Sequence, residues 1–409
     1  MTPPPVFVLG GYQSDFARHL AREGVDLSEL VREVVEGALS DARVDVTDVD
    51  AVHVGNAFGE LFLGQAQLGA MPATVVPALW GKPAARHEAA CASGSIAVLA
   101  AAAEIEAGRY DCVLVLGVEQ ERNVPGEVAA QHLGAAAWVG QEGKDVRYLW
   151  PHMFSLIADE IDHRDGLKTE HLAAIARKNF ANAKLNPNAQ TRAWTFVPAA
   201  FEANDTLNPI VEGRLRRHDC GQVSDGGAAV LLASERYVAA RRRSVSNLAR
   251  LVGWGHRTAG LPLGDKLRRS AGQPYLLPHV REAIVDAYRR ARLPGPEALD
   301  GIETHDCFTV TEYLAIDHFG ITPPGQSWQA IEDGRLERSG KLPVNPSGGL
   351  IGLGHPVGAT GVRMLLDGAR QVTGRAGDLQ VEGARRFATL NIGGSGTTAV
   401  SLVVEREKI

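Results

Sequence analysis

Cys91 is the side chain of this sequence with the clearest potential for covalent chemistry. It stands in the string His87-Glu-Ala-Ala-Cys91-Ala-Ser93, and a long alanine-rich apolar run follows at once. The run predicts a buried helix that starts at the cysteine and ends near Gly108. A cysteine in a first helical turn faces the positive end of the helix dipole and unpaired backbone N–H groups, which favour the thiolate. We therefore expect Cys91 to be a nucleophile.

Three further strings combine reactive or polar side chains with glycine. They are His305-Asp-Cys307-Phe308, Gly354-His355-Pro-Val-Gly358 and Asn391-Ile-Gly393-Gly-Ser-Gly396. Each comes at the end of an expected strand or in a glycine-rich loop, where the reactive groups of α/β enzymes gather. A neutral imidazole near a cysteine can accept the thiol proton, so the four strings together indicate an acyl-transfer site.

The expected elements around these strings follow the same order in the two halves of the chain. In the first half we expect strands over 6–10, 49–56 and 112–117 and helices over 27–40, 65–70 and 91–107. In the second half we expect strands over 248–253, 299–305, 387–391 and 398–404 and helices over 280–291, 310–319 and 360–372. The stretches 48–58 and 298–308 match in pattern, which predicts an internal duplication. The fold class is α/β, with each half a sheet covered by helices.

A long polar segment separates the two halves. We expect residues 1–118 to form the N-terminal half, 119–245 an inserted loop domain, and 246–409 the C-terminal half. The insertion is irregular, with one clear helix over 168–183, and its last strand, 228–233, returns to the N-terminal sheet. Because most connections are short, an insertion of this length usually carries function.

Bulk composition narrows the class of protein. The 409 residues are 45% hydrophobic and 22% charged with a net charge of −6, typical of a soluble enzyme and without the basic excess of nucleic-acid-binding proteins. The four cysteines lie far apart without a C-x-x-C pair, which argues against a disulfide framework or a zinc site. His163 and His171 are the nearest ligand pair, and we interpret them as solvated surface; no metal is expected. No secretory signal or membrane-spanning run is present, so we expect a cytoplasmic protein.

Over essentially its whole length the sequence resembles the thiolase family, and it looks most like the sterol-carrier-protein-2 type of thiolase. Cys91-Ala-Ser93-Gly is similar to the family's nucleophile motif, and Gly354-His355-Pro to its histidine motif. His305-Asp-Cys307-Phe is the variant that marks this subtype. The resemblance implies the thiolase fold, with two duplicated halves whose sheets pack around buried helices, and a loop domain that binds coenzyme A.

The resemblance also implies an activity and a role for each residue. It implies an acyltransferase that runs Claisen condensation or thiolysis of 3-ketoacyl-CoA through an acyl-cysteine. Cys91 would accept the acyl group, His355 would take the thiol proton, and Cys307 would remove the α-proton. Asn391 stands where other thiolases carry a second cysteine, and Cys307 compensates for that departure.

Two oxyanion holes are implied, because negative charge develops on thioester oxygens in both half-reactions. One would use His355 with His305 or its bound water, and the other the backbone N–H groups of Cys91 and Gly393. The Asn391 side chain either touches the active site or caps a turn, and Met153 is a candidate for lining the acyl pocket. Cys112 fits the core, and Cys220 a structural role.

Coenzyme A is expected as a substrate, together with acyl-CoA, and not as a permanently bound cofactor. We expect one or two cations of the loop domain to contact its phosphates, without knowing which. The candidates are Arg177, Lys178, Lys184, Arg192, Arg214, Arg216 and Arg217. The resemblance implies a homodimer or homotetramer that acts in lipid metabolism.

Two other functions stay open. One is a decarboxylating ketosynthase on the same fold, which would use Cys91, His305 and His355; Cys307 argues against it, because decarboxylation creates the carbanion without an acid–base thiol. The other is a non-catalytic thiolase-like subunit that works with a small acyl-CoA-binding partner protein. The presence of Cys91, Cys307 and both histidines argues against inactivity.

Overall fold

Nine strands form one mixed sheet through the centre of the molecule. The computed structural model describes residues 4–241 and 247–408, and the strand order is β3-β2-β4-β7-β1-β8-β11-β10-β9. The strands are β1 (Val6–Gln13), β2 (Ala51–Gly55), β3 (Ala84–His87), β4 (Cys112–Glu119), β7 (Gly226–Ser234), β8 (Asn247–Thr258), β9 (Gly301–Thr304), β10 (Arg386–Gly393) and β11 (Thr398–Lys408). The short strands β5 (Ile210–Glu212) and β6 (Leu215–Arg216) pair separately.

The sheet is built twice from the same plan. In the N-terminal half β2 runs parallel to β4, and β7 lies antiparallel between β4 and β1. In the C-terminal half β9 runs parallel to β10, and β11 lies antiparallel between β10 and β8. The halves join where β1 pairs with β8 over Val6–Val8 and Ala249–Leu251, so the two expected sheets are continuous at this edge. The expected duplication of an α/β unit is confirmed.

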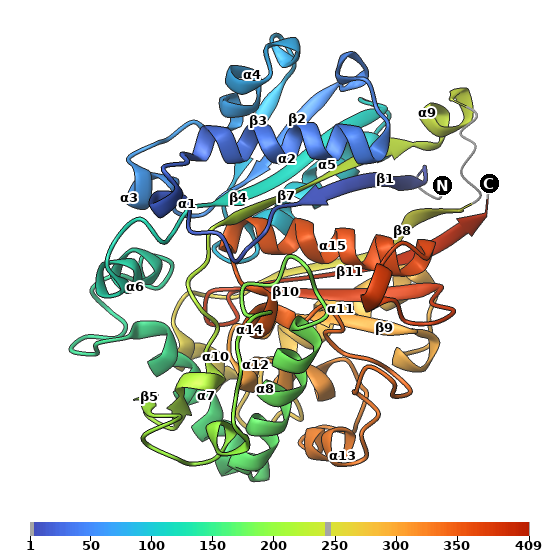
Figure 1. The fold of residues 1–409 in the computed structure, drawn as a ribbon. Coiled ribbons are helices and arrows are strands. Elements are labelled where there is room, and N and C mark those ends of the chain that lie inside the picture. Colours follow the sequence, from blue (N-terminus) through green and yellow to red (C-terminus); the bar gives the residue numbers. More distant parts are fainter. Residues whose placement is uncertain (1–3, 242–246, 409) are drawn as a thin grey trace.

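Two helices are enclosed between the halves. α5 (Ser93–Glu106) and α15 (Val357–Thr373) lie between the N-terminal strands and the C-terminal strands, as Figure 1 shows. α5 carries alanine on most faces, and the first thirteen residues of α15, 357–369, are all buried. A helix that is apolar or paired on every side needs such an enclosed place. Both helices begin at the same end of the molecule as the reactive strings.

Further helices pack on the outer faces of the sheet. α2 (Leu27–Ala42) covers the N-terminal half (Figure 1), and its start is fixed by a capping box of Asp26 and Glu29. α11 (Pro278–Ala291) and α12 (Thr309–His318) pack on the C-terminal half in one apolar core with Leu390 and Ile392. The expected helices over 27–40, 280–291, 310–319 and 360–372 are thus confirmed, with ends shifted by a few residues.

One expected helix is wrong. Residues 65–70 form no α-helix; a 3₁₀ turn over Leu68–Ala70 lies between α3 (Gly59–Leu63) and α4 (Met71–Val75). Gly64 adopts a left-handed conformation with φ of 66° and ends α3, and Gln67 is also left-handed with φ of 54°. Two left-handed residues in four break the helical path.

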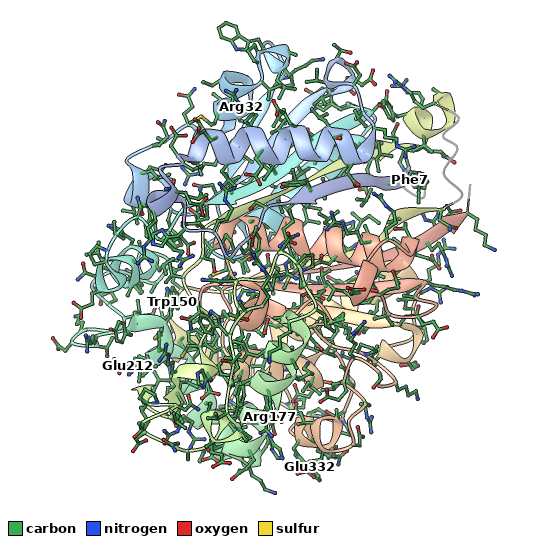
Figure 2. All side chains as sticks on the ribbon, in the orientation of Figure 1. Phe7, Arg32, Trp150, Arg177, Glu212 and Glu332 are labelled. Atoms are coloured by element: carbon green, nitrogen blue, oxygen red, sulfur yellow. The ribbon has the colours of Figure 1, made fainter. Side chains whose placement is uncertain are left out.

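The segment between the halves holds more helix than expected. Besides α8 (Thr169–Ala183), it contains α6 (Gly126–Gly134) and α7 (Leu149–Asp165), so the expectation of one helix is wrong. α7 buries Phe154, Ile157, Ala158 and Ile161, a helical spacing that its polar flanks obscure. Trp150 of α7 donates its Nε1–H to the carbonyl of Leu133 in α6 over 2.9 Å, and Figure 2 labels it on this outer part of the molecule.

Shorter helices complete the chain. They are α1 (Leu20–Glu23), α9 (Glu235–Ala240), α10 (Leu263–Arg269), α13 (Ser327–Glu332) and α14 (Gly349–Leu353). α14 lies inside the glycine-rich loop that leads to His355. None of the helices in the described ranges combines the length and apolar character needed to cross a bilayer.

Candidate active site

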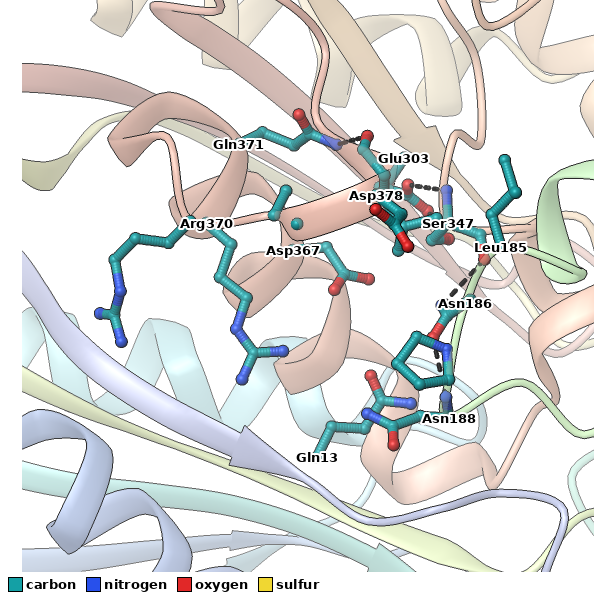
Figure 3. A pocket seen from close by; sticks show the side chains of 15 residues that line it. Gln13, Leu185, Asn186, Asn188, Glu303, Ser347, Asp367, Arg370, Gln371 and Asp378 are labelled. Carbon is teal, nitrogen blue, oxygen red and sulfur yellow. Dashed lines mark hydrogen bonds between the residues drawn. The ribbon is translucent and has the colours of Figure 1, made fainter.

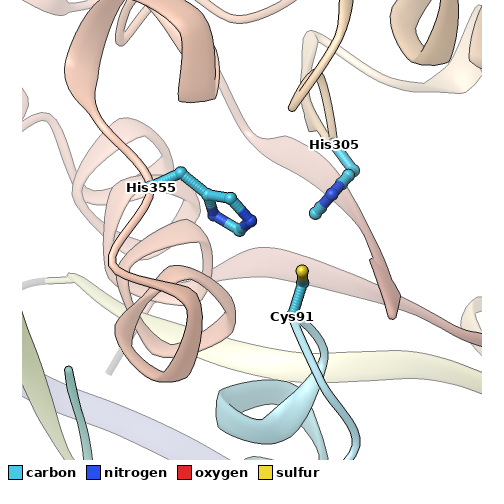
Figure 4. A group of neighbouring side chains, drawn as sticks. All are labelled: Cys91, His305 and His355. Carbon is cyan, nitrogen blue, oxygen red and sulfur yellow. The ribbon is translucent and has the colours of Figure 1, made fainter. Parts of the chain in front are cut away.

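Cys91, His305 and His355 meet at one point between the two halves. Their sulfur and nitrogen donor atoms all lie within 4.8 Å of one another. Figure 4 shows the thiol below and between the two imidazoles, whose ring centres are 5.1 Å apart at an angle of 87°. Cys91 precedes α5, His305 follows β9, and His355 precedes α15. The structure thus brings together three residues that are separated by up to 264 positions in the sequence.

A tight turn presents the thiol. Cys91 lies two residues before the first residue of α5, Ser93, and so precedes the first helical turn in which we expected it. Ala90 adopts a left-handed backbone with φ of 50°, a strained conformation for a residue with a Cβ. The Ser93 hydroxyl braces the turn, because it accepts from the N–H of Ala89 at 2.9 Å and donates to the carbonyl of Ala90 at 2.6 Å.

The thiol of Cys91 is protonated in the resting site. Burial raises its pKa to about 12, and the charges of Glu121 and Glu119 act in the same direction. The backbone N–H groups of Gly394 and of Cys91 itself oppose this shift but are outweighed. Burial therefore opposes the expected thiolate, whereas a helix terminus stabilises a charge by only about 0.3–1 kcal/mol.

His355 is held with a free nitrogen toward the thiol. Its backbone N–H donates to Ser224 Oγ at 2.9 Å, and its Nδ1 lies 2.7 Å from Thr360 Oγ1. The Thr360 hydroxyl donates to the carbonyl of Pro356, so it accepts from Nδ1–H, which leaves the lone pair on Nε2. Nε2 is buried without a partner. Burial, helped by the charge of Arg363, lowers the pKa of His355 to about 3, so the imidazole is neutral.

His305 has the opposite tautomer. Its Nδ1 lies 3.1 Å from Nδ2 of Asn391, whose Oδ1 accepts from the Ser95 hydroxyl at 2.8 Å. Because the amide donates to Nδ1, the ring proton of His305 is on Nε2. Burial lowers the pKa of His305 well below its ordinary value, and His355 and Arg363 add to the shift. One imidazole is thus a proton acceptor and the other a proton donor, and Asn391 contacts the site instead of only capping a turn.

Cys307 lies close enough to Cys91 for their charges to interact. Burial raises the pKa of Cys307 well above its ordinary value, and the charge of a Cys91 thiolate is the next largest cause. Its thiol is 3.9 Å from Thr311 Oγ1, and its carbonyl accepts from the N–H of Gly221 at 2.8 Å. Cys307 follows His305 by two residues, and its role in the reaction stays a prediction.

A buried polar network supports the loop between His305 and Cys307. Asp306 accepts from the backbone N–H of Leu350 at 2.5 Å and from Asn179 of α8 at 2.8 Å. The same Asn179 donates to Glu312 at 2.7 Å, and Lys178 forms a buried ion pair with Glu312 at 2.5 Å. Burial raises the pKa of Asp306 to about 8. The network ties α8 of the loop segment to the loop that carries two site residues.

Comparison with known protein families shows to which family the chain belongs. Residues 6–236 match the thiolase N-terminal domain, and residues 267–406 match the thiolase C-terminal domain-like family. The chain belongs to the thiolase family. It is 33% identical over 384 residues to acetyl-CoA acetyltransferase of Methanothermobacter thermautotrophicus, covering 93% of this chain and 95% of that protein. It is 31% identical over 418 residues to sterol carrier protein 2 of Homo sapiens, covering 97% of this chain and 71% of that protein.

Solved thiolases share the fold of this chain. The human mitochondrial 3-ketoacyl-CoA thiolase in complex with CoA matches with a TM-score of 0.69 at 18% identity, over 99% of this chain and 98% of that one. The Ltp2-ChsH2(DUF35) aldolase matches with a TM-score of 0.79 at 21% identity, over 99% and 98%. At such identities the likeness establishes the fold and leaves the chemistry to the site.

Most candidate cations of this thiolase's loop segment have other partners. Lys178 is buried in its ion pair with Glu312, which excludes it from a surface phosphate contact. Arg192, Arg214 and Arg216 pair with aspartates. Arg177, labelled in Figure 2, is exposed, with its guanidinium 5.7 Å from the ring centre of Phe201. A contact of any of these cations with coenzyme A stays a prediction.

Two cavities lie near the thiolase site. One, of about 640 Å³, is lined by the residues that flank Cys91, Ala89 and Ala90, and by Gly393 and Gly394. A second cavity, of about 400 Å³, is lined by residues that include Glu303, Arg370 and Gln13 (Figure 3). The second cavity is not lined by any of the four reactive side chains.

The other residues singled out in the sequence lie in the core or on the surface. Met153 is buried in α7, in the apolar cluster against which Cys307 packs, and its role in an acyl pocket stays a prediction. Cys112 is fully buried in β4, and Cys220 donates its thiol to the carbonyl of Arg216 at 3.3 Å. Within the described residues, none of the four cysteines takes part in a disulfide. His171 is buried and pairs with Glu332 at 2.8 Å, so our interpretation of this residue as solvated surface is wrong.

Within the described residues, the donor set near enough to hold a metal ion is Cys91, His305 and His355. A thiol and two imidazoles suit Zn²⁺. The backbone N–H groups around Cys91 and the free Nε2 of His355 suit acyl transfer equally, so we interpret the set as a nucleophile with its acid–base partners.

Sequence reasoning missed Arg363, whose charge lowers the pKa of both histidines. The guanidinium of this fully buried residue bonds Glu303 and Asp367, each at 2.9 Å. Its charge disfavours the imidazolium form of His305 and His355. A sequence signal existed, because Arg363 lies eight residues after His355, within α15, and Glu303 lies two residues before His305.

Proposed function

We propose that this chain is an acyltransferase that catalyses the reversible Claisen condensation of acyl-CoA with acetyl-CoA, and the thiolysis of 3-ketoacyl-CoA, through an acyl-Cys91 intermediate. The observation that carries the proposal is the pair of opposite tautomers around one thiol, a free Nε2 on His355 and an Nε2–H on His305. The 33% identity to an acetyl-CoA acetyltransferase supports it.

In the first half-reaction the Cys91 sulfur attacks the carbonyl carbon of an acyl thioester. The thiol proton passes to Nε2 of His355, which returns it to the departing sulfur of coenzyme A. The backbone N–H of Cys91, with that of Gly393, would stabilise the carbonyl oxygen as charge develops on it. The N–H of Gly394 faces the Cys91 thiol directly and is a further candidate.

In the second half-reaction the Cys307 thiolate takes a proton from the α-carbon of acetyl-CoA. Its raised pKa makes Cys307 a strong base once ionised. The Nε2–H of His305 would stabilise the resulting enolate oxygen. The expected contribution of His355 would need a proton on its Nε2, which the resting tautomer leaves unprotonated. The enolate carbon then attacks the acyl-Cys91 carbonyl, so that a carbon–carbon bond forms and the bond to Cys91 breaks. The proton that Cys307 removed passes to the departing Cys91 sulfur, which restores the Cys91 thiol and the Cys307 thiolate.

Acyl labelling separates the two cysteine roles. Cys91→Ser should abolish covalent labelling by radioactive acetyl-CoA, whereas Cys307→Ala should still be labelled but fail to condense. Thiolysis of 3-ketoacyl-CoA substrates of different chain lengths by free coenzyme A would give the acyl preference. If the chain condenses only malonyl thioesters and cannot cleave acetoacetyl-CoA, it is a decarboxylating ketosynthase and the proposal is wrong.

A thiolase-like subunit with a small partner protein is the alternative function. The aldolase that shares the fold is named as a complex with a DUF35 protein, which motivates this alternative. Thiolysis by the isolated chain would contradict it. Activity that appears only after a partner is added would support it.

We also propose a homodimer or homotetramer that acts in the cytoplasm in lipid metabolism. The edge strand β3 supports an oligomer, because Ala84 and Ala85 are exposed and such edges readily pair with another strand. Sedimentation velocity of the purified chain tests this, and a monomer at micromolar concentration would contradict it.

A further inference from the structure

A hairpin turn between β10 and β11, formed by residues 394–397, lies beside the nucleophile. A Cβ on Gly393, at the end of β10, would lie 2.2 Å from the carbonyl oxygen of Ala89, so this strand end closely approaches the Cys91 turn. Gly394 lines the same cavity as Ala89, and its N–H faces the Cys91 thiol. The hairpin turn and the strand end before it thus carry backbone N–H groups close to where a thioester oxygen would lie.

Lys266 of α10 is bonded to the hairpin turn. Its Nζ donates to Ser395 Oγ and to Thr397 Oγ1, each at 2.9 Å, and to the carbonyl of Leu261 at 2.7 Å. A lysine ammonium has three donor hydrogens, so all three are used, and two of them are used on the turn. The side chain is buried, with an exposed fraction of 5% for the residue. Lys266 therefore ties the hairpin turn to α10.

A second helix also contacts the hairpin turn. Nε2 of His279 in α11 lies 2.6 Å from the carbonyl oxygen of Gly396, so this nitrogen carries the ring proton and donates it. Burial lowers the pKa of His279, and the charge of Lys266 adds to that shift, so the imidazole is neutral at pH 7. The turn is thus held by one cation from α10 and one neutral donor from α11.

Lys266 is a charge buried without an ion pair. Within residues 4–241 and 247–408, the hydrogen-bond partners of Nζ are all neutral oxygens, and no carboxylate lies within ion-pair distance. Burying a charge costs free energy, which hydrogen bonds to neutral oxygens offset only in part. An apolar side chain at this place in α10 would avoid that cost. The ammonium therefore indicates a role at the hairpin turn beyond the packing of α10.

We propose that Lys266 is a positioning residue, which holds the hairpin turn so that the backbone N–H groups of Gly393 and Gly394 face the thioester oxygen on the nucleophile. The inference rests on the proposed function in taking Cys91 as the acyl acceptor. Such donors stabilise a developing oxyanion only when they are fixed at hydrogen-bond distance from it, and a displacement of about 1 Å can cost about a hundredfold in rate. Lys266 acts through the turn, because its own three hydrogens are used there and on Leu261.

The charge of Lys266 decides how many hydrogen bonds it donates. The ammonium donates three, whereas the neutral amine donates two. Burial lowers the pKa of Lys266 from 10.5 to about 8, although the charges of Glu142, in the loop after α6, and of Asp265 on α10 oppose this shift. His279 is already neutral at pH 7 and does not titrate above it. As pH rises past about 8, one hydrogen bond is therefore lost and the turn is held less firmly.

The test is single-turnover acylation of Cys91 by acetyl-CoA and by p-nitrophenyl acetate in Lys266→Met and in the unaltered chain, with Cys91 followed by peptide mass spectrometry. Methionine fills a similar volume but donates no hydrogen bond. We expect the limiting acylation rate of the variant to fall between about tenfold and a hundredfold, with an unchanged half-saturating concentration of acetyl-CoA, because the lost interaction acts in the transition state.

The pH dependence of acylation supplies a second readout from the same two proteins. The ratio of the unaltered rate to the Lys266→Met rate should fall as pH rises from about 7 to about 10, because only the unaltered chain loses a hydrogen bond at the turn. Titrations that both proteins share cancel in this ratio. Arg268→Met is the matched control, since Arg268 lies two residues further along α10, is exposed and pairs with Asp265. Its rate and pH dependence should equal those of the unaltered chain.

Equal limiting rates in folded Lys266→Met overturn the proposal, and so does a loss confined to the half-saturating concentration or a rate ratio that is constant with pH. If that variant fails to fold, Ser395→Ala decides, because it removes one acceptor and keeps the cation. Its limiting rate should fall about fivefold, and an unchanged rate overturns the proposal.

The ester separates this inference from the proposed function, because p-nitrophenyl acetate acylates a thiol without coenzyme A. A chain that the ester acylates with the expected loss in Lys266→Met, but that acetyl-CoA does not acylate, would refute the proposed function alone. A chain that acetyl-CoA acylates equally fast with and without Lys266 would refute this inference alone.

Discussion

Equivalent strands of the two halves end at the site, but the residues at those strand ends differ in type. β2 pairs with β4 from Ala51 and Val113 onward, and β9 pairs with β10 from Gly301 and Phe387 onward, in the same parallel register. Counting along these strands matches three positions of the N-terminal half with three reactive positions of the C-terminal half. The matched positions are Gly55 and His305, Ala57 and Cys307, and Gly117 and Asn391.

Small residues in the N-terminal half allow helices to approach the strands. A Cβ on Gly117 would lie 2.1 Å from the carbonyl oxygen of Gly358 in α15. A Cβ on Gly55 would lie 2.7 Å from the Cα of Gly94 in α5. The N-terminal strand ends therefore fix where α5 and α15 begin, and the C-terminal strand ends supply side chains to the thiol presented there. The duplication teaches that one scaffold position can serve either close packing or chemistry.

Removing the reactive group from the C-terminal half should have the largest effect. Cys307→Ala makes this position resemble Ala57, and we expect condensation to fall on the order of 10³-fold or more because the α-proton acceptor is lost. Steady-state condensation and thiolysis assays measure it. Cys220→Ala is the matched control, since the Cys220 thiol donates to the Arg216 carbonyl and has no role in the proposed reaction, and it should stay near the unaltered rate. Condensation at the unaltered rate in Cys307→Ala would show that Cys307 has no chemical role that its counterpart Ala57 lacks.

Adding a side chain to the N-terminal half should disturb the fold instead. Gly117→Ala places a methyl group against the backbone of Gly358 and should lower the free energy of unfolding by about 3 kcal/mol. Gly126→Ala is the control, because no atom lies within 4 Å of its Cβ and its φ is ordinary. That variant should be neutral or slightly more stable. Urea unfolding compares the two, and equal stabilities would show that close packing at Gly117 is not what the N-terminal half provides.

Element order and the reactive residues could be predicted because their signals are local. The apolar run after Cys91 and the repeated pattern of 48–58 and 298–308 are visible in the sequence, and both led to the observed places. Convergence of Cys91, His305 and His355 followed from the rule that strand ends and helix starts gather at one edge. The helix α6 was missed because it buries only Ala129, and α7 was missed because polar residues interrupt its buried positions.

Charge states could not be predicted, because they depend on neighbours distant in the sequence. The helix start predicts a Cys91 thiolate, but burial and Glu121 reverse the sign. Arg363 affects two histidines only after α15 is packed beside β9. The tautomer of His305 likewise depends on Asn391, 86 residues away.

Asn391 of the C-terminal half occupies the position that matches Gly117 of the N-terminal half, so its substitution also tests the difference between the halves. Asn391→Ala removes the donor to Nδ1 of His305 and lets the ring proton move to that nitrogen. We expect condensation to fall about tenfold, the usual effect of one buried hydrogen bond, while acyl labelling of Cys91 changes less. Single-turnover acylation and steady-state condensation, measured side by side, separate the two steps. Equal losses in both steps would mean that Asn391 supports the whole site and not the donor nitrogen of His305.

The two halves should also lose stability in opposite directions of pH change. The pKa of His355 is lowered from 6.5 to about 3, so below pH 6.5 the unfolded chain binds a proton that the folded chain does not, and stability falls as pH falls toward 3. The pKa of Glu119 is raised from 4.5 to about 7, so the folded chain holds the extra proton, and stability falls as pH rises from 4.5 to 7. Each group contributes a slope of at most about 1.4 kcal/mol per pH unit. Urea unfolding from pH 4 to 8 should show a shallower acid loss in His355→Asn and a shallower loss toward neutral pH in Glu119→Gln. The slope of the unfolding free energy against pH should change in opposite directions in the two variants. A change in the same direction in both would contradict a neutral His355 in one half and a protonated Glu119 in the other.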